Sequence, residues 1–259
     1  MKTAGRVRPP AVAGSFYPAD PAELRSVVEA FVGEQGAAAK AIIAPHAGYV
    51  FSGPVAGSAY ARVARGRVSR VVLLGPAHRV PDAGIAVSSA DAFSTPLGLV
   101  PVDTSTRDAL VDAGLVTVRD DAHASEHSLE VHLPFLQVCL GDVSVLPLAV
   151  GQVDPVRVAE VLDRAWGGEE TLIVVSTDLS HYLDHATAAR LDRRTAEAVV
   201  ARRPDRLGPY DACGLVPLQG LLLAAERHGL EVELLDLRTS ADTAGGPARV
   251  VGYGAFALA

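Results

Sequence analysis

The chain alternates between short apolar runs and longer segments in which apolar residues recur every three or four positions. The apolar runs cover residues 40–45, 70–78, 142–150 and 171–178. Runs of this length are typical of strands buried on both faces of a sheet, whereas the three-to-four spacing is typical of helices with one buried face. Their alternation along the chain predicts strand–helix–strand units and a largely parallel sheet.

Three helices are expected, the first ahead of residues 40–45 and the others between the apolar runs. Asp20 stands at a cap position, Pro21 follows where its missing N–H costs nothing, and Glu23 can reach back toward the cap. The apolar face of this first helix comprises Leu24, Val27, Val28 and Phe31. A second helix is expected to begin at Pro54, and a third to cover residues 155–166.

Shorter segments complete the expected fold. Additional strands are expected at residues 84–89, 98–103, 115–119, 232–240 and 249–258. The first three of them flank a helix expected at residues 106–113, so part of the sheet can be antiparallel. We therefore predict the α/β class, as a single three-layer α/β/α domain over residues 1–259 with a mixed, largely parallel central sheet.

Composition excludes several classes of protein. The 259 residues are 49% apolar and 20% charged, which excludes a disordered chain. The formal net charge of −7 argues against a nucleic-acid partner, because phosphate backbones are bound by clustered cations. Only Cys139 and Cys213 are present, so no disulfide framework is expected. Neither a signal-peptide core nor a membrane-length apolar run is found, and we expect a cytoplasmic protein that does not enter a membrane.

Polar side chains follow four of the expected strands. His46, His78, Asp178, His181 and Asp242 all occur in such positions, within the motifs PHAGY, GPAH, STDLSH and TSADT. In open α/β sheets, ligands bind in the crevice beyond the carboxyl ends of the strands. These five residues are therefore candidates for one shared site.

Two of these residues predict a metal site. His46 or His78 alone is best interpreted as a turn residue, but two histidines that each follow a buried strand favour metal ligation. Imidazole suits iron, zinc and copper, and two histidines with one carboxylate leave positions open for substrate and dioxygen. Asp178 and Asp242 are the candidate carboxylates, although an aspartate at a strand end is also a common helix cap.

His181 is assigned a proton-transfer role. It follows Asp178 by three residues, a spacing that lets a carboxylate orient an imidazole or lets His181 serve as general base.

The segment at residues 123–136, HASEHSLEVHLPFL, is dense in histidine. Ser125 can cap a helix on which His127 and Glu130 lie near one face, as a wall of the pocket. The alternative is a partly exposed polar helix with an apolar stripe. The remaining histidines are expected to be surface or structural residues; they are His123, His132, His185 and His228.

The two cysteines differ in their expected roles. Cys213 opens a helix, where the dipole would lower the thiol pKa and favour reactivity, unless it is simply a small buried residue. Cys139 lies on an apolar helix and is expected in the core. No GxGxxG, Walker A or GxSxG motif occurs, so nucleotide binding and serine hydrolysis gain no support.

The chain resembles a known family in a series of ordered motifs. They are GSFYP, PHAGYVFSGPVAG, LLGPAH, EHSLEVHLPFL, STDLSHY, DACG and VVGYGAFAL. These motifs resemble the Memo family, whose bacterial members are also called AmmeMemoRadiSam system protein B, and the match extends over nearly the whole chain. The family is similar in fold to the class III extradiol dioxygenases (LigB-like proteins), which bind non-haem iron through two histidines and a carboxylate.

The resemblance implies metal ligation by His46 and His78, with Asp178 and His181 as the family's acid and histidine. It also implies partners among the AMMECR-like and radical SAM proteins of the same system, whereas animal members are described as binding phosphorylated peptides.

One implied ligand differs in this sequence. Animal members contribute a cysteine from the loop before the last strand, and the alignment places Thr243 there, with Asp242 beside it. Threonine is a poor metal ligand, so either Asp242 takes the third position, or metal is bound weakly, or the site serves another purpose.

Three functions remain open at this point. They are a metal-dependent oxidoreductase of dioxygenase type, a zinc metallohydrolase, and a non-catalytic module that binds a peptide or protein in the same cleft. The expected metal is divalent, iron first, with copper or zinc as alternatives. The expected metal ligands are His46, His78 and Asp242, and the expected catalytic residues are His181, Asp178 and His127.

Overall fold

A large mixed sheet forms the centre of the computed structural model, which describes residues 5–82 and 84–259. Within these residues, eight strands follow one another in the order β10-β12-β2-β9-β3-β8-β4-β7, and the ninth, β11, pairs with β12. Its strands are β2 (Ala41–Ala44), β3 (Arg70–Pro76), β4 (Ile85–Val87), β7 (Thr117–Val118), β8 (Ser144–Val150), β9 (Thr171–Ser176), β10 (His181–Leu183), β11 (Val232–Thr239) and β12 (Val250–Leu258).

The four central strands, β2, β9, β3 and β8, are parallel. On either side of them the sheet becomes antiparallel, where β12 pairs with β2 and β4 pairs with β8. The prediction of an α/β fold with a mixed central sheet is therefore confirmed, and its parallel pairings are those among the four central strands and that of β4 with β7.

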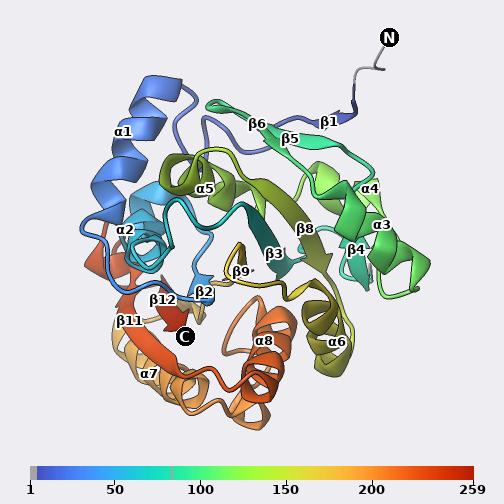
Figure 1. The fold of residues 1–259 in the computed structure, drawn as a ribbon. Helices are drawn as coiled ribbons and strands as arrows, with labels where there is room; N and C mark the ends of the chain where they lie inside the picture. The colour runs from blue at the N-terminus through green and yellow to red at the C-terminus, as the bar shows by residue number, and fades with distance from the viewer. Residues whose placement is uncertain (1–4, 83) are drawn as a thin grey trace.

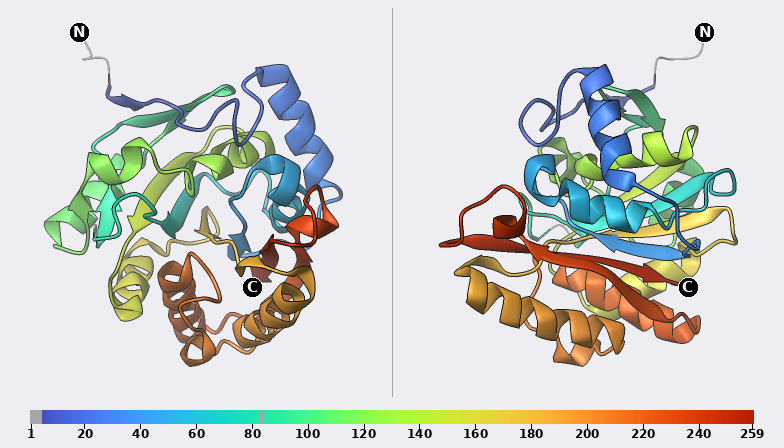
Figure 2. Two further views of the ribbon diagram at one scale, coloured as in Figure 1. Left: turned by 180° about the vertical axis from the view of Figure 1, so that it is seen from behind. Right: turned by 90° about the vertical axis from the view of Figure 1, so that its left-hand side faces the viewer.

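Helices cover both faces of this sheet (Figures 1 and 2). They are α1 (Pro21–Val32), α2 (Tyr49–Tyr60), α3 (Thr104–Asp112), α4 (Asp120–Ala124), α5 (Leu133–Leu140), α6 (Pro155–Ala165), α7 (His185–Val200) and α8 (Leu215–Arg227), with short 3-10 turns η1 (Glu130–His132), η2 (Pro204–Arg206) and η3 (Ser240–Asp242). Successive strand residues point to opposite faces. Thus Ile42 packs in one core cluster with α1, α2 and α5, whereas Ile43 packs in a second with α6, α7 and α8.

A separate three-stranded sheet lies near the N-terminus of the described chain. It pairs β1 (Val7–Arg8) with β5 (Ala92–Thr95) and β5 with β6 (Gly98–Pro101). In Figure 1 it lies at the top, beyond α5 and away from α7 and α8. Its buried residues Phe93 and Val100 belong to the same core cluster as Ile42 of the large sheet.

Helix α1 begins as predicted, whereas α2 begins five residues earlier than expected. The Asp20 carboxylate accepts hydrogen bonds from the backbone of Ala22 and Glu23, which caps α1. Helix α2 begins at Tyr49, and Pro54 lies inside it. The Tyr49 N–H donates to Phe16 O (2.7 Å), and its buried hydroxyl donates to Val131 O (2.6 Å). These contacts fix the helix start ahead of the proline, so the prediction from Pro54 was wrong.

Two glycines allow α2 to pack closely against α1. A Cβ atom at Gly57 would lie 2.0 Å from the backbone oxygen of Phe31, and one at Gly53 would lie 2.2 Å from the Phe31 ring. Real Cβ atoms do not approach so closely, so the contact between these two helices requires glycine.

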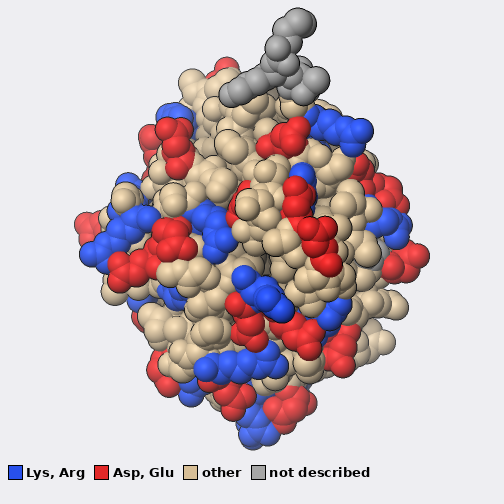
Figure 3. Space-filling model, turned by 45° about the vertical axis from the view of Figure 1, so that its right-hand side comes forward, with Lys and Arg blue, Asp and Glu red and all other residues tan. Residues whose placement is uncertain are grey.

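The surface in Figure 3 intersperses Lys and Arg with Asp and Glu. On that face, the described residues form no continuous basic patch of the kind that binds phosphate backbones. Among the residues described, no helix is both long enough and apolar enough to cross a membrane.

We predict that Gly57→Ala lowers the free energy of unfolding by about 1–3 kcal/mol, because the added methyl group overpacks the contact with α1. Urea-induced unfolding measures the change. The control is Gly246→Ala, since a Cβ at Gly246 meets no atom within 4 Å. Equal stability of the Gly57→Ala and Gly246→Ala variants would contradict the close contact.

Candidate metal centre

Loops from separate parts of the chain meet beyond the carboxyl ends of the parallel strands. His46 follows β2, His78 follows β3, Asp178 follows β9, and Cys213 precedes α8. They surround a cavity of about 650 Å³. Its lining comprises His46, His78, His127, Asp178, Leu179, His181, Tyr182, Leu183, Leu191, Pro209, Tyr210, Ala212 and Cys213. Four of the five residues that were expected to share a site therefore line one cavity, and Asp242 does not.

His46 lies at the buried end of this cavity, with 2% of its surface exposed. Its Nδ1 lies 2.6 Å from Ser176 Oγ, and that hydroxyl donates its hydrogen to Ser128 O (2.6 Å). The hydroxyl therefore accepts from His46, which places the imidazole proton on Nδ1 and leaves a lone pair on Nε2. Burial, followed by the neighbouring imidazoles, lowers the pKa of His46 well below its usual value, so the ring is neutral.

His78 is held in the same way by a carboxylate. Its Nδ1 lies 2.9 Å from Glu126 Oε1, and its backbone N–H donates to Glu126 Oε2 (2.6 Å). Burial alone raises the pKa of Glu126, but His78 and the Ser128 N–H lower it to about 2. The ionised Glu126 thus accepts the Nδ1 proton, and Nε2 is the acceptor atom of the neutral His78 ring.

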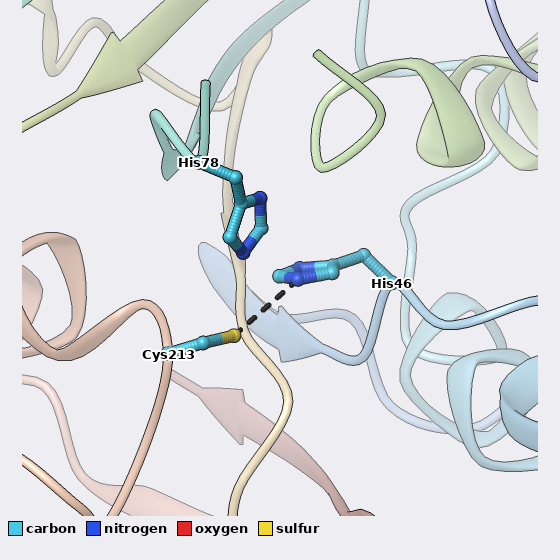
Figure 4. Close-up of side chains that lie close together, drawn as sticks. All are labelled: His46, His78 and Cys213. Atoms are coloured by element: carbon cyan, nitrogen blue, oxygen red, sulfur yellow. Dashed lines mark hydrogen bonds between the residues drawn. The ribbon is translucent and has the colours of Figure 1, made fainter. Parts of the chain in front are cut away.

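Cys213 supplies a sulfur atom beside these two rings. Its Sγ lies 3.3 Å from His46 Nε2 and accepts from the Asp178 N–H at 3.3 Å. Figure 4 shows His46, His78 and Cys213 pointing toward one another, and their candidate ligand atoms lie within 4.8 Å of one another. Burial, and then the nearby Asp178 carboxylate, raise the pKa of the thiol to about 12. Cys213 does not open a helix, because α8 begins at Leu215. The expected lowering of the thiol pKa by a helix dipole is therefore not found.

Asp178 joins two of the loops instead of capping a helix. Its Oδ1 accepts from the His46 backbone N–H at 2.7 Å, and the residue is 4% exposed. Burial raises the pKa of its carboxyl to about 6, although the His46 N–H favours the ionised form. Asp178 thereby holds the loop after β2 against the loop after β9.

Two further imidazoles line the cavity. His127 stacks on His78, with ring centroids 4.8 Å apart and planes 15° apart. His127 lies in the loop between α4 and η1. Ser125 ends α4 instead of starting a helix, so the prediction of a helix after Ser125 was wrong. His181 Nδ1 lies 2.8 Å from Leu179 O, an acceptor, which places its proton on Nδ1 and leaves Nε2 as a lone pair.

Asp242 and Thr243 lie outside this group of side chains. The Asp242 carboxylate accepts from the N–H and hydroxyl of Thr239 and lies 3.3 Å from His185 Nε2. The Thr243 hydroxyl donates to Ser240 O. Neither residue is among those that line the cavity. The structure does not bring Asp242 to His46 and His78, and it places Cys213 there instead.

Glu130 is not a pocket wall. It is fully buried, and its carboxylate pairs with Arg8 and accepts from the N–H groups of Ala11 and Val12 and from the Tyr17 hydroxyl. Glu130 therefore fastens the N-terminal segment to η1, and the prediction that it lines the pocket was wrong.

The sequence argument missed Ser176 and Glu126. It named Cys213 but did not place it beside His46. Glu126 immediately precedes His127 in the histidine-dense segment, which is a usable signal. Cys213 stands in the DACG motif but precedes a helix, so a search of strand ends does not reach it. The role of Ser176 depends on one hydroxyl orientation and leaves no pattern in the sequence.

The remaining histidines lie outside the cavity. His123 Nε2 contacts Ala86 O at 3.0 Å, and His132 Nδ1 contacts the Tyr60 hydroxyl at 2.9 Å. His185 lies beside Asp242, and His228 stacks on Trp166. Their contacts are structural, as the sequence argument expected. Burial lowers the pKa of His132 to about 3.

The chain is thus a mixed α/β protein in which imidazoles and a thiol lie beyond the parallel strands. The sequence pattern of the family described as Memo-like protein matches residues 8–257, so the chain belongs to the Memo family.

Relatives support this assignment over the full length. The chain is similar to a MEMO1 family protein of Methanopyrus kandleri, with 38% identity over 96% of this chain and 98% of the relative. It is also similar to one of Aquifex aeolicus, with 36% identity over 96% and 97%. An uncharacterized Escherichia coli K12 protein of known crystal structure shares the fold, with a TM-score of 0.51 at 11% identity, covering 83% of this chain and 98% of that protein.

We predict that protonation of His132 destabilises the fold as the pH falls. Its pKa is lower in the folded state than in the unfolded chain, so the unfolded state binds the proton first and stability is lost below about pH 6.5. Between pH 7 and pH 4 this group alone costs about 3 kcal/mol. Urea unfolding of His132→Phe should therefore show a smaller loss over that range than the parent protein. Parallel losses would mean that His132 does not titrate as described.

Proposed function

We propose that the protein is a metal-dependent oxidoreductase whose divalent metal is held by His46, His78 and Cys213. The observation that carries the proposal is the convergence of two Nε2 lone pairs and one sulfur at the end of a cavity. Each imidazole already has its Nδ1 proton bound by Ser176 or Glu126. This is how proteins orient histidine ligands toward a metal.

The donor set fits a transition metal better than a hard cation. Imidazole and thiolate suit iron, zinc and copper, whereas magnesium and calcium prefer oxygen ligands. The raised pKa of the Cys213 thiol means that a metal would displace its proton on binding. Iron remains the first metal to test, because a redox-active ion at this position would supply one-electron chemistry toward substrate or dioxygen.

The chain supplies proton acceptors beside that position. His127 and His181 line the cavity, and the proton of His181 is held on Nδ1 by Leu179 O. A free Nε2 is suited to accept a proton from a substrate hydroxyl or amine. Asp178 would keep the loop of His46 in place and, through its backbone N–H, direct the sulfur of Cys213. The cavity of about 650 Å³ is large enough for a small-molecule substrate.

A zinc hydrolase is the second candidate, and the sulfur favours it. Three protein ligands with an open fourth position are typical of catalytic zinc sites, which can include cysteine, and bound zinc lowers the pKa of water. The same side chains would serve both reactions, so the identity of the retained metal decides between them.

The test is metal binding by protein prepared without oxygen and offered Fe²⁺, Cu²⁺ or Zn²⁺ separately. We expect one equivalent of metal per chain by elemental analysis, and loss of affinity of at least about 10-fold in His46→Ala, His78→Ala and Cys213→Ser. Oxygen uptake with iron bound supports the oxidoreductase, whereas retention of zinc alone with hydrolytic turnover supports the hydrolase.

Two controls make this test specific. Cys139→Ser changes the other, buried cysteine, and Asp242→Asn changes the carboxylate that lies outside the cavity. Both should bind metal like the parent protein. Loss of metal in Asp242→Asn with retention in Cys213→Ser would contradict the proposed ligand set, and no binding by any variant or by the parent would contradict the proposed function.

A further inference from the structure

Glu126 contacts two cavity imidazoles at once. Its Oε1 lies 2.9 Å from His78 Nδ1 and 3.3 Å from His127 Nδ1, and the side chain is 1% exposed. We propose that Glu126 is a positioning residue that orients the His78 ring through Nδ1 and holds His127 through its backbone N–H, keeping Nε2 of His78 turned toward the cavity. The inference rests on the proposed function for its purpose, but its geometry can be tested without metal.

Every close partner of Glu126 is a hydrogen-bond donor. Oε2 accepts from the His78 N–H at 2.6 Å, and Oε1 accepts from the N–H groups of His127 and Ser128 at 2.9 Å each. An ionised carboxylate is acceptor-only and satisfies all of them, whereas a protonated carboxyl or an amide would oppose at least one N–H. The backbone around residues 126–128 is therefore folded around an anion.

The same contacts argue against Glu126 as a metal ligand. Glu126, His78 and His127 have potential ligand atoms within 4.8 Å of one another, so they qualify by distance as a second metal site. However, both carboxylate oxygens already accept hydrogen bonds, and His78 Nδ1 is one of the partners. A cation at this position would have to displace these donors. The cluster therefore orients the imidazole rings instead of binding a metal.

Stacking extends the effect of the carboxylate to the second ring. The planes of His78 and His127 differ by only 15°, and Glu126 Oε1 is hydrogen-bonded to His78 Nδ1 and to the His127 backbone N–H. Phe16 packs against His127, with ring centroids 4.8 Å apart. Stacking fixes the planes, and Glu126 selects the edge of the His78 ring that carries the proton, so Nε2 of His78 is left as the acceptor.

Glu130 provides a matched comparison within the same segment. It is also a buried glutamate, but its partners are Arg8, Tyr17 and the N-terminal backbone, and none is a cavity residue. A purely structural role for Glu126 predicts that the two glutamates behave alike when substituted. A positioning role predicts that only Glu126 affects the imidazoles.

The experiment compares Glu126→Gln and Glu130→Gln with the parent protein. Long-range ¹H–¹⁵N NMR of metal-free protein at about pH 8.5 reports the tautomer of each neutral imidazole, with signals assigned through His78→Gln and His127→Gln. We expect His78 to carry the proton on Nδ1 in the parent and in Glu130→Gln, and to lose that preference in Glu126→Gln.

Metal affinity is the second measurement, with Fe²⁺ or Zn²⁺ as the probe. We expect binding about 10–100-fold weaker in Glu126→Gln and unchanged within about 2-fold in Glu130→Gln, as is typical when a partner of a ligating histidine is removed. Urea unfolding should show that Glu130→Gln loses stability despite its unchanged affinity.

Several results would overturn the inference. The parent protein with the proton on Nε2 of His78 would overturn it, and this measurement stands even if Glu126→Gln does not fold. Equal loss of affinity in both glutamine variants would also overturn it. Absence of metal binding by the parent, with the Nδ1 tautomer present, would instead count against the proposed function and leave the orientation of the rings supported.

Discussion

Parallel pairing of β2, β9, β3 and β8 is the constraint on which the site depends. Ala44 of β2 pairs with Ser176 of β9, and Leu74 of β3 pairs with Val175, so these strands end nearly in step. The loops that follow must therefore leave the sheet at one edge, where the helices on both faces leave a crevice. Residues separated by more than a hundred positions in sequence meet there because of strand register.

Within that crevice, the hydrogen bonds to Nδ1 decide what the imidazoles can do. In its neutral form each ring has one N–H, and Nδ1 faces an acceptor: Ser176 for His46, Glu126 for His78 and Leu179 O for His181. Buried polar groups must find partners, so this arrangement satisfies the donors and leaves Nε2 as the acceptor, beside the Cys213 sulfur in the case of His46. A cavity lined with such acceptors is suited to a cation or to a ligand that brings its own N–H or O–H donors.

The sequence was informative wherever burial alone determines structure. The apolar runs at residues 70–78 and 171–178 predicted strands β3 and β9, and position at strand ends selected His46, His78 and His181 from eight histidines. It failed where a tertiary contact decides. The start of α2 depends on the burial of Tyr49, and the neighbour of His46 proved to be Cys213, contributed by a loop that follows no strand.

The expected third donor was a carboxylate, whereas the structure places a thiol beside the two imidazoles. This difference changes the chemistry of the site more than its charge. A thiolate carries the same single negative charge, so a divalent ion with two neutral imidazoles would retain one positive charge. Asp178 lies against the same sulfur through its backbone N–H, and burial raises the pKa of its carboxyl. Burial and that carboxylate raise the pKa of the Cys213 thiol, so the thiol keeps its proton unless a cation displaces it. The softer sulfur then favours transition metals over magnesium or calcium, which is the property that a redox role requires.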